Sequence, residues 1–88
     1  MPEVTVTIVN RLGLHARPAM SFVDTASGFA SKITVCRDKQ CVDGKSIMQM
    51  MMLAATKGAQ LRIRAEGPDA DKACQALSRL VADGFDEE

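Results

Sequence analysis

The sequence predicts an α+β fold, an open-faced β-sandwich in which a four-stranded antiparallel sheet carries three helices on one face, in the order βαββαβα. Three observations predict it. Four segments alternate apolar with polar residues, three segments repeat apolar residues at helical spacing, and turn-forming residues separate them. The chain has 88 residues, of which 47% are hydrophobic. That length suits one core, so we expect a single domain over residues 1–88.

The first strand and the first helix are separated by a short loop. Residues 4–8 alternate valine or isoleucine with threonine, which is the period of a half-buried strand. Residues 10–13 interrupt that pattern, and a helix follows that tolerates Pro18 in its first turn and that Gly28 would end. The apolar positions at helical spacing are Ala16, Ala19, Met20, Val23 and Ala26.

A hairpin and a second helix come next. Residues 32–36 alternate as a strand, residues 37–39 supply a turn, and residues 40–42 form a short partner strand. Ser46, followed three residues later by Gln49, has the form of a capping box. It predicts a helix that begins at Ser46 and that Gly58 would close.

The last strand and the last helix complete the order. Residues 61–66 alternate leucine, isoleucine and alanine with charged residues, and a Gly-Pro pair ends the strand. Asp69 is placed to cap a helix that Gly84 would end. The apolar positions of this helix are Ala70, Ala73, Cys74, Leu77, Leu80 and Val81.

Composition argues against several classes of protein. Eleven basic residues balance eleven acidic ones, so no strong attraction to nucleic acid or to anionic lipid is expected. The start of the chain lacks the pattern of a signal peptide, and no apolar run approaches the roughly 20 residues of a membrane helix. We therefore expect a cytoplasmic protein that does not insert into the membrane.

The three cysteines contain no Cys-x-x-Cys pair. Cys36 and Cys41 flank the predicted hairpin turn and could face each other. In a reducing cytoplasm, however, partly buried reduced thiols are the expected state. We predict no metal site and no redox role from these residues.

The only histidine, His15, stands where the first strand has ended and the first helix begins. The first turn of a helix has amide N–H groups without intrahelical partners and a partial positive charge, so it favours an anion. A phosphoryl group on His15 would meet those amides, and the guanidinium of Arg17 could pair with its oxygens. From these residues alone, His15 could equally be a loop histidine without a function that happens to precede a helix.

The surrounding motif favours the functional interpretation. The run Gly13-Leu14-His15-Ala16-Arg17-Pro18-Ala19, the run Lys45-Ser46-Ile47-Met48, the element order and the length resemble HPr, the histidine-containing phosphocarrier family of the bacterial sugar phosphotransferase system. This resemblance covers the whole chain. It implies that enzyme I phosphorylates His15, that Arg17 stabilises the phosphohistidine, and that enzyme IIA domains of sugar transporters accept the group. It implies a carrier rather than a stand-alone enzyme, with no cofactor, acting as a monomer.

Ser46 has two compatible roles. As a helix cap it would contribute about 1 kcal/mol. In many relatives of the HPr family a dedicated ATP-dependent kinase phosphorylates the serine at this position, and the resemblance extends to Lys45-Ser46-Ile47-Met48. Regulatory phosphorylation by an HPr serine kinase/phosphorylase, and recruitment of transcriptional regulators, are therefore expected of Ser46.

The second predicted helix is apolar on more sides than one sheet can bury. Some of its methionines should stay exposed as adaptable contact surface, since a carrier docks on several partners with one face. The residues that the resemblance places in this surface are Met20, Ile47, Met48 and Met51, with Lys45 as a contact to acidic partners. Asp24, Ser27 and Gln49 stand where some relatives have basic residues, so partner affinities should differ.

Three other functions compete with this one. A carrier of the nitrogen-related regulatory branch would keep His15 and Arg17. A small metal- or RNA-binding α+β module shares the element order, but the chain lacks metal-ligand cysteine spacing and has no tyrosine or tryptophan for stacking bases. An acyl carrier would be acidic and essentially helical, which this chain is not.

Overall fold

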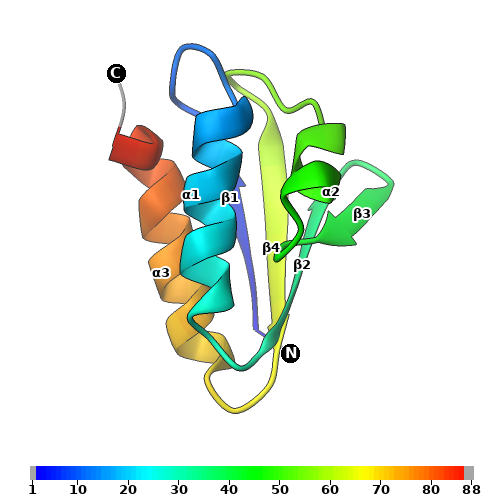
Figure 1. Ribbon diagram of the computed structural model, residues 1–88, viewed down its shortest axis with the longest axis vertical. Helices are drawn as coiled ribbons and strands as arrows, with labels where there is room; N and C mark the ends of the chain where they lie inside the picture. Colours follow the sequence, from blue (N-terminus) through cyan, green and yellow to red (C-terminus); the bar gives the residue numbers. More distant parts are fainter. Residues whose placement is uncertain (1, 87–88) are drawn as a thin grey trace.

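The structure, a computed structural model, describes residues 2–86. Its four strands and three α-helices follow the predicted order, and a short 3₁₀ turn, η1 (Gly84–Asp86), comes last (Figure 1). The strands are β1 (Glu3–Thr7), β2 (Lys32–Arg37), β3 (Gln40–Asp43) and β4 (Gln60–Glu66). The helices are α1 (Ala16–Ser27), α2 (Ile47–Met52) and α3 (Ala70–Ala82). The predicted α+β open-faced sandwich is confirmed.

The sheet has the strand order β1-β4-β2-β3, and each neighbouring pair is antiparallel. The β1–α1–β2 connection and the β3–α2–β4 connection each step over one strand. Both connections place their helix on the same face, where α3 also lies (Figure 1). Among residues 2–86, no helix lies on the opposite face of the sheet.

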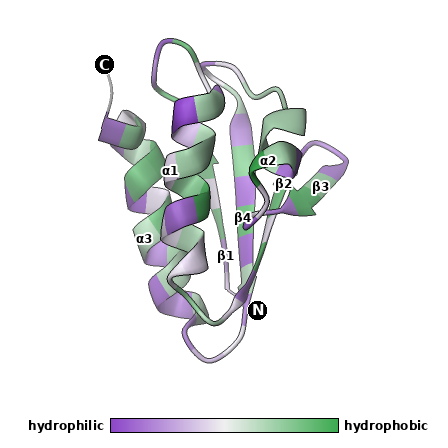
Figure 2. Ribbon diagram, in the orientation of Figure 1, coloured by the Kyte–Doolittle hydropathy of each residue, from purple (hydrophilic) through white to green (hydrophobic). Residues whose placement is uncertain are grey.

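Alternation along the strands sorts the side chains between these two faces. In β4, Leu61, Ile63 and Ala65 are fully buried beneath the helices, while Arg62 and Arg64 point to the helix-free face. Figure 2 shows this alternation as bands along β4. Arg64 pairs with Glu3 on β1 at 3.1 Å. Burial of the apolar face is the main stabilising contribution, at roughly 25 cal/mol per Å².

The second helix is shorter than predicted. It ends at Met52, so the expectation that Gly58 closes it is wrong. Arg37 explains the early end, because its Nη1 donates to the carbonyl oxygens of Leu53 and Ala54, both at 2.9 Å. Those carbonyls leave the helical pattern, and Ala54 adopts a φ of +49°. A tertiary contact therefore ends the helix.

Only one half of the predicted capping box forms at the start of α2. The Oγ of Ser46 accepts a hydrogen bond from the Gln49 amide at 3.2 Å, which confirms Ser46 as the cap. The reciprocal half of the capping box is wrong. The Gln49 Oε1 accepts from the amide of Asp43, and the Ser46 amide donates to the Asp43 carbonyl instead. The glutamine thus ties the helix to the end of β3.

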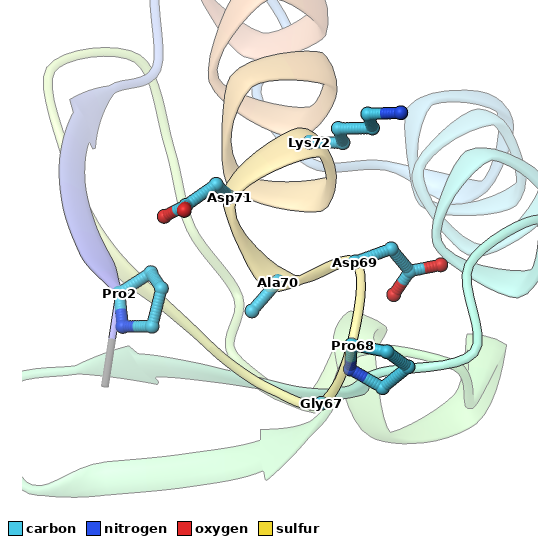
Figure 3. A pocket seen from close by; sticks show the side chains of 7 residues that line it. All are labelled: Pro2, Gly67, Pro68, Asp69, Ala70, Asp71 and Lys72. Atoms are coloured by element: carbon cyan, nitrogen blue, oxygen red, sulfur yellow. The ribbon is translucent and has the colours of Figure 1, made fainter.

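Asp69 occupies the predicted N-cap position of α3 but makes no side-chain bond to that helix. Its carboxylate accepts hydrogen bonds from the amides of Ala30 and Ser31 and from the Ser31 hydroxyl. Figure 3 shows the carboxylate pointing from the start of α3 toward the segment between α1 and β2. The expected local cap is wrong because three donors from a distant loop occupy the carboxylate.

These bonds predict a pH dependence of stability. The hydrogen bond from the Ser31 hydroxyl, and then that from the Ala30 amide, lower the pKa of Asp69 from its ordinary value of 3.8. A lowered pKa contributes stability that is present above pH 3.8 and is lost as the pH falls through the folded value. We expect Asp69→Asn to be less stable at pH 7 and to lose less stability than the parent on acidification. Urea titrations between pH 7 and pH 2 measure this, with Asp24→Asn, at an exposed position on α1, as the control. Parallel curves for parent and Asp69→Asn would contradict it.

The cysteines differ from expectation. Cys36 and Cys41 form a disulfide, so the expectation of two reduced thiols is wrong in this structure. The physical reason is the register of the hairpin. The two residues lie directly opposite each other on β2 and β3, with their Cα atoms 4.0 Å apart.

In residues 2–86, no helix has the length and apolar character needed to span a bilayer.

Candidate functional site

His15 is the N-cap residue of α1, as predicted. Its backbone is extended, with φ −81° and ψ −172°, and its carbonyl accepts the first helical hydrogen bond, from the Ala19 amide at 3.0 Å. The imidazole is partly exposed and makes no side-chain cap bond to the helix. The site therefore presents a ring at the positive end of a twelve-residue helix.

The loop before His15 is held from several directions. Gly13 has a φ of +70°, its amide donates to the Asn10 carbonyl, and its own carbonyl accepts from Asn10 Nδ2 at 2.7 Å. Leu14 is 5% exposed in the core, and its amide donates to the Ala55 carbonyl at 2.8 Å. Because Leu14 is anchored on one side and α1 begins on the other, the position of His15 is set by the fold.

A Cβ at Gly13 would meet the backbone of the segment after α2. It would lie 2.5 Å from the carbonyl oxygen of Ala55 and 2.8 Å from the Cα of Thr56. Only glycine permits this approach together with a left-handed φ. The close contact brings the end of α2 against the loop that carries His15.

The first turn of α1 supplies the groups that an anion needs. The amides of Ala16 and Arg17 have no intrahelical partner, whereas Pro18 has no N–H and is buried against the core. Arg17 is exposed, so its guanidinium is accessible to a group on the neighbouring ring. No acidic residue lies in this first turn to compete with an anion. The arrangement suits a phosphoryl group carried on an imidazole.

Comparison with known proteins agrees with this geometry. The sequence model of the PTS-HPr family, described as the PTS HPr component phosphorylation site, matches residues 2–83. The chain belongs to the HPr family of phosphocarrier proteins. The phosphocarrier protein HPr of Pseudomonas aeruginosa is 49% identical, over 99% of this chain and 98% of its own length.

Solved structures show the same fold. A crystal structure of HPr from Thermoanaerobacter tengcongensis has a TM-score of 0.96 and 48% identity, covering 100% of this chain and 99% of that one. A second structure, of an HPr dimer from the same organism, has a TM-score of 0.79 and 47% identity, covering 99% and 100%. The resemblance to the HPr family, and a carrier component of the phosphotransferase system, are thereby confirmed.

Exposed apolar side chains occur along α2 and at Met20 on α1. Met20 is 50% exposed, Met48 80%, and Met51 43%, with Ile47 close behind, whereas Met50 is fully buried. Figure 2 shows most of α2 in the green of hydrophobic residues, and α1 packs against this helix. The prediction that some methionines stay exposed is confirmed.

Among residues 2–86, three large exposed apolar residues lie outside the surface that the resemblance predicted, namely Val9, Leu12 and Met52. Leu12 in the loop before His15 is 64% exposed, and Met52 at the end of α2 is 65% exposed. The sequence could have indicated the exposure of Leu12, because this apolar residue stands between a turn and a glycine. Met52 belongs to the apolar residues of the second predicted helix, some of which were expected to stay exposed.

Lys45 is half-buried, and its ammonium donates to the carbonyl oxygen of Phe29 at 2.7 Å. This hydrogen bond holds the charged end of the side chain against the loop after α1. Ser46, the next residue, is also half-buried. Both lie next to the exposed methionines.

Two other features bear on the competing functions. Among residues 2–86, no three histidine, cysteine, aspartate or glutamate side chains gather as a metal site would require. A shallow pocket opens between the start of β1 and the start of α3, lined by Pro2 and residues 67–72 (Figure 3). It lies at the opposite end of the molecule from the start of α1 (Figure 1).

Proposed function

We propose that this chain accepts a phosphoryl group from phosphorylated enzyme I on His15 and transfers it to enzyme IIA domains of sugar transporters. It acts in the cytoplasm, as a monomer, and as a carrier rather than as an enzyme with its own turnover. The observation that supports this most directly is the place of His15. It caps a twelve-residue helix on a loop anchored by Leu14 and Gly13, in a chain that belongs to the HPr family of phosphocarriers.

The chemistry requires only an unprotonated ring nitrogen of His15. Its lone pair attacks phosphorus, the bond between phosphorus and the donor atom breaks, and the electron pair of that bond returns to the donor. The amides of Ala16 and Arg17 and the guanidinium of Arg17 then meet the phosphoryl oxygens. Transfer onward is the same step in reverse, so the site must stabilise the group without trapping it.

The docking surface consists of Met20, Lys45, Ile47, Met48 and Met51. Unbranched thioether side chains adapt to different partner surfaces, which suits one face that meets both donor and acceptors. Their exposure supports this role. The charge of Lys45 would complement acidic partner residues.

The proposal is tested by incubating the chain with phosphoenolpyruvate and enzyme I and measuring its mass before and after acid treatment. One acid-labile phosphate per chain is expected. Reconstitution with enzyme I and IIA proteins of the sugar branch, and in parallel with those of the nitrogen-related branch, separates the two kinds of carrier. Faster phosphorylation by the nitrogen-related donor would move the chain to that branch.

We further propose that Ser46 is a regulatory phosphorylation site for an HPr serine kinase/phosphorylase, and that the modified chain recruits transcriptional regulators. Ser46 borders the docking surface, so a phosphate there would add negative charge beside Lys45 and Ile47. Partners that present acidic groups would then bind less tightly.

Ser46→Ala is expected to remove the acid-stable phosphate formed with ATP and the kinase, and to lower the unfolding free energy by about 1 kcal/mol through loss of the cap. Ser46→Asn is the matched control, because asparagine caps as well as serine but has no hydroxyl. It should retain stability and still take up no phosphate. Acid-stable phosphate in either variant would place the regulatory site elsewhere.

A further inference from the structure

The disulfide lies on the helix-free face of the sheet, across a tight hairpin. Cys36 pairs with Cys41, and Arg37 pairs with Gln40. Asp38 and Lys39, which lie between Arg37 and Gln40, form the turn. Asp38 adopts a φ of +54°, as such two-residue turns require. The sulfur atoms are therefore brought together by the hairpin itself, whether or not they are bonded.

The two cysteines differ in exposure. Cys36 is 1% exposed, whereas Cys41 lies on the edge strand β3 and is exposed. Thiol–disulfide exchange begins at a sulfur that an external thiolate can reach. This difference favours Cys41 as the position that an external thiolate attacks and Cys36 as the one that leaves.

A cation accompanies the buried sulfur. Arg62 of β4 stands directly opposite Cys36 in the sheet register, on the same face. Its Nη2 donates to the Asp38 carbonyl at 2.9 Å, so the guanidinium reaches across β2 to the turn. A nearby arginine favours the thiolate that leaves when the disulfide opens.

The hairpin also holds the end of α2. Arg37, the residue after Cys36, donates to the carbonyls of Leu53 and Ala54. The next carbonyl, that of Ala55, accepts from the Leu14 amide beside His15. A continuous series of contacts thus joins the cysteine pair to the loop of the proposed phosphoryl acceptor.

We propose that Cys36 and Cys41 form a reversible thiol–disulfide site that exchanges with low-molecular-weight thiols and their disulfides. The oxidation state of this pair sets how firmly the hairpin holds the end of α2 and the His15 loop. The regulatory meaning rests on the proposed cytoplasmic carrier function, since disulfides in that compartment are usually transient. The cysteine chemistry itself does not depend on it.

The exchange balances in two steps. On oxidation, the Cys41 thiolate attacks a small disulfide RSSR, forming a mixed disulfide and releasing RS⁻. The Cys36 thiolate then attacks the Cys41 sulfur, closing the Cys36–Cys41 bond and releasing a second RS⁻. The two protons of the cysteine thiols pass through solvent to the two RS⁻ ions, so RSSR is reduced by two electrons to 2 RSH. Reduction by two RSH is the reverse.

The site is tested by equilibrating the full chain with glutathione at a series of reduced-to-oxidised ratios, trapping thiols with N-ethylmaleimide and measuring mass. A Cys74→Ser background removes the third cysteine, whose pKa is raised because burial disfavours its thiolate. Two thiols should appear together across an intermediate range of ratios. In the single-cysteine variants, Cys41 should form the glutathione adduct on the order of tenfold faster than Cys36. A pair that stays closed, or stays open, at every ratio overturns the proposal.

The coupling is tested by amide hydrogen exchange in the oxidised and reduced chain. Closing this short loop should slow exchange at Leu14 and Ala54 on the order of tenfold. In Arg37→Gln the difference at Leu14 should vanish, while the thiol titration stays unchanged. Equal exchange in both redox states of the parent would refute the coupling. These readouts need no enzyme I, so failure of phosphorylation would count against the carrier function alone.

Discussion

Replacing His15 with alanine is expected to abolish acid-labile phosphate uptake from phosphoenolpyruvate and enzyme I. His15 is the only histidine in the sequence, so no other imidazole can substitute as acceptor. The loss should be complete rather than partial, because the nucleophile itself is removed. Intact mass before and after acid treatment measures it, and retention of one acid-labile phosphate by the variant would refute the assignment.

The fold serves as the internal control for this variant. Because His15 is partly exposed, the unfolding free energy should change by no more than about 1 kcal/mol. Arg17→Lys tests the neighbouring role. Lysine keeps the charge but not the forked pair of donors, so uptake should continue at a reduced rate. Unchanged transfer in both Arg17→Lys and Arg17→Ala would remove Arg17 from the site.

Gly13→Ala is expected to impair both folding and phosphoryl uptake. The new Cβ would meet the Ala55 carbonyl oxygen at 2.5 Å, and backbone must move to accommodate it. With the cost of a left-handed φ added, the unfolding free energy should fall by roughly 2–3 kcal/mol. The displacement also breaks the bond between Leu14 and Ala55 that positions His15. Denaturant titration and phosphorylation rate measure the two effects.

Gly58→Ala is the matched control, because Gly58 has a φ of +93° but nothing within 4 Å of an added Cβ. It should show backbone strain alone, at roughly 1 kcal/mol, with the phosphorylation rate of the parent. The comparison separates strain from the clash. Equal effects of the two substitutions on phosphorylation would contradict the anchoring role of Gly13.

The regular elements were predictable because each has a local cause. Alternation along residues 4–8 and 61–66 describes strands with one buried face, and helical spacing describes α1 and α3. The position of His15 at a helix start was predictable for the same reason: it depends on residues within a few positions of it.

What could not be predicted depends on residues far apart in the chain. Asp69 was placed correctly, but its carboxylate serves Ser31, which is 38 residues away. The second helix ends where Arg37 donates to the carbonyl oxygens of Leu53 and Ala54, which are 16 and 17 residues away in the chain. Neither contact alters the local periodicity of the sequence. Local patterns therefore predicted a second helix that is too long and a side-chain cap by Asp69 that does not form.

The sequence by itself determined the α+β order, the helix N-cap at His15 and the motif that names its family, since periodicity, capping and a contiguous motif are local properties. Only the tertiary structure decided that the segment after α2 lies against Gly13, that Arg37 binds the carbonyls just beyond this helix, and that Cys36 and Cys41 form a disulfide. These features depend on register and packing between separate segments, where many pairings are compatible with the same local pattern.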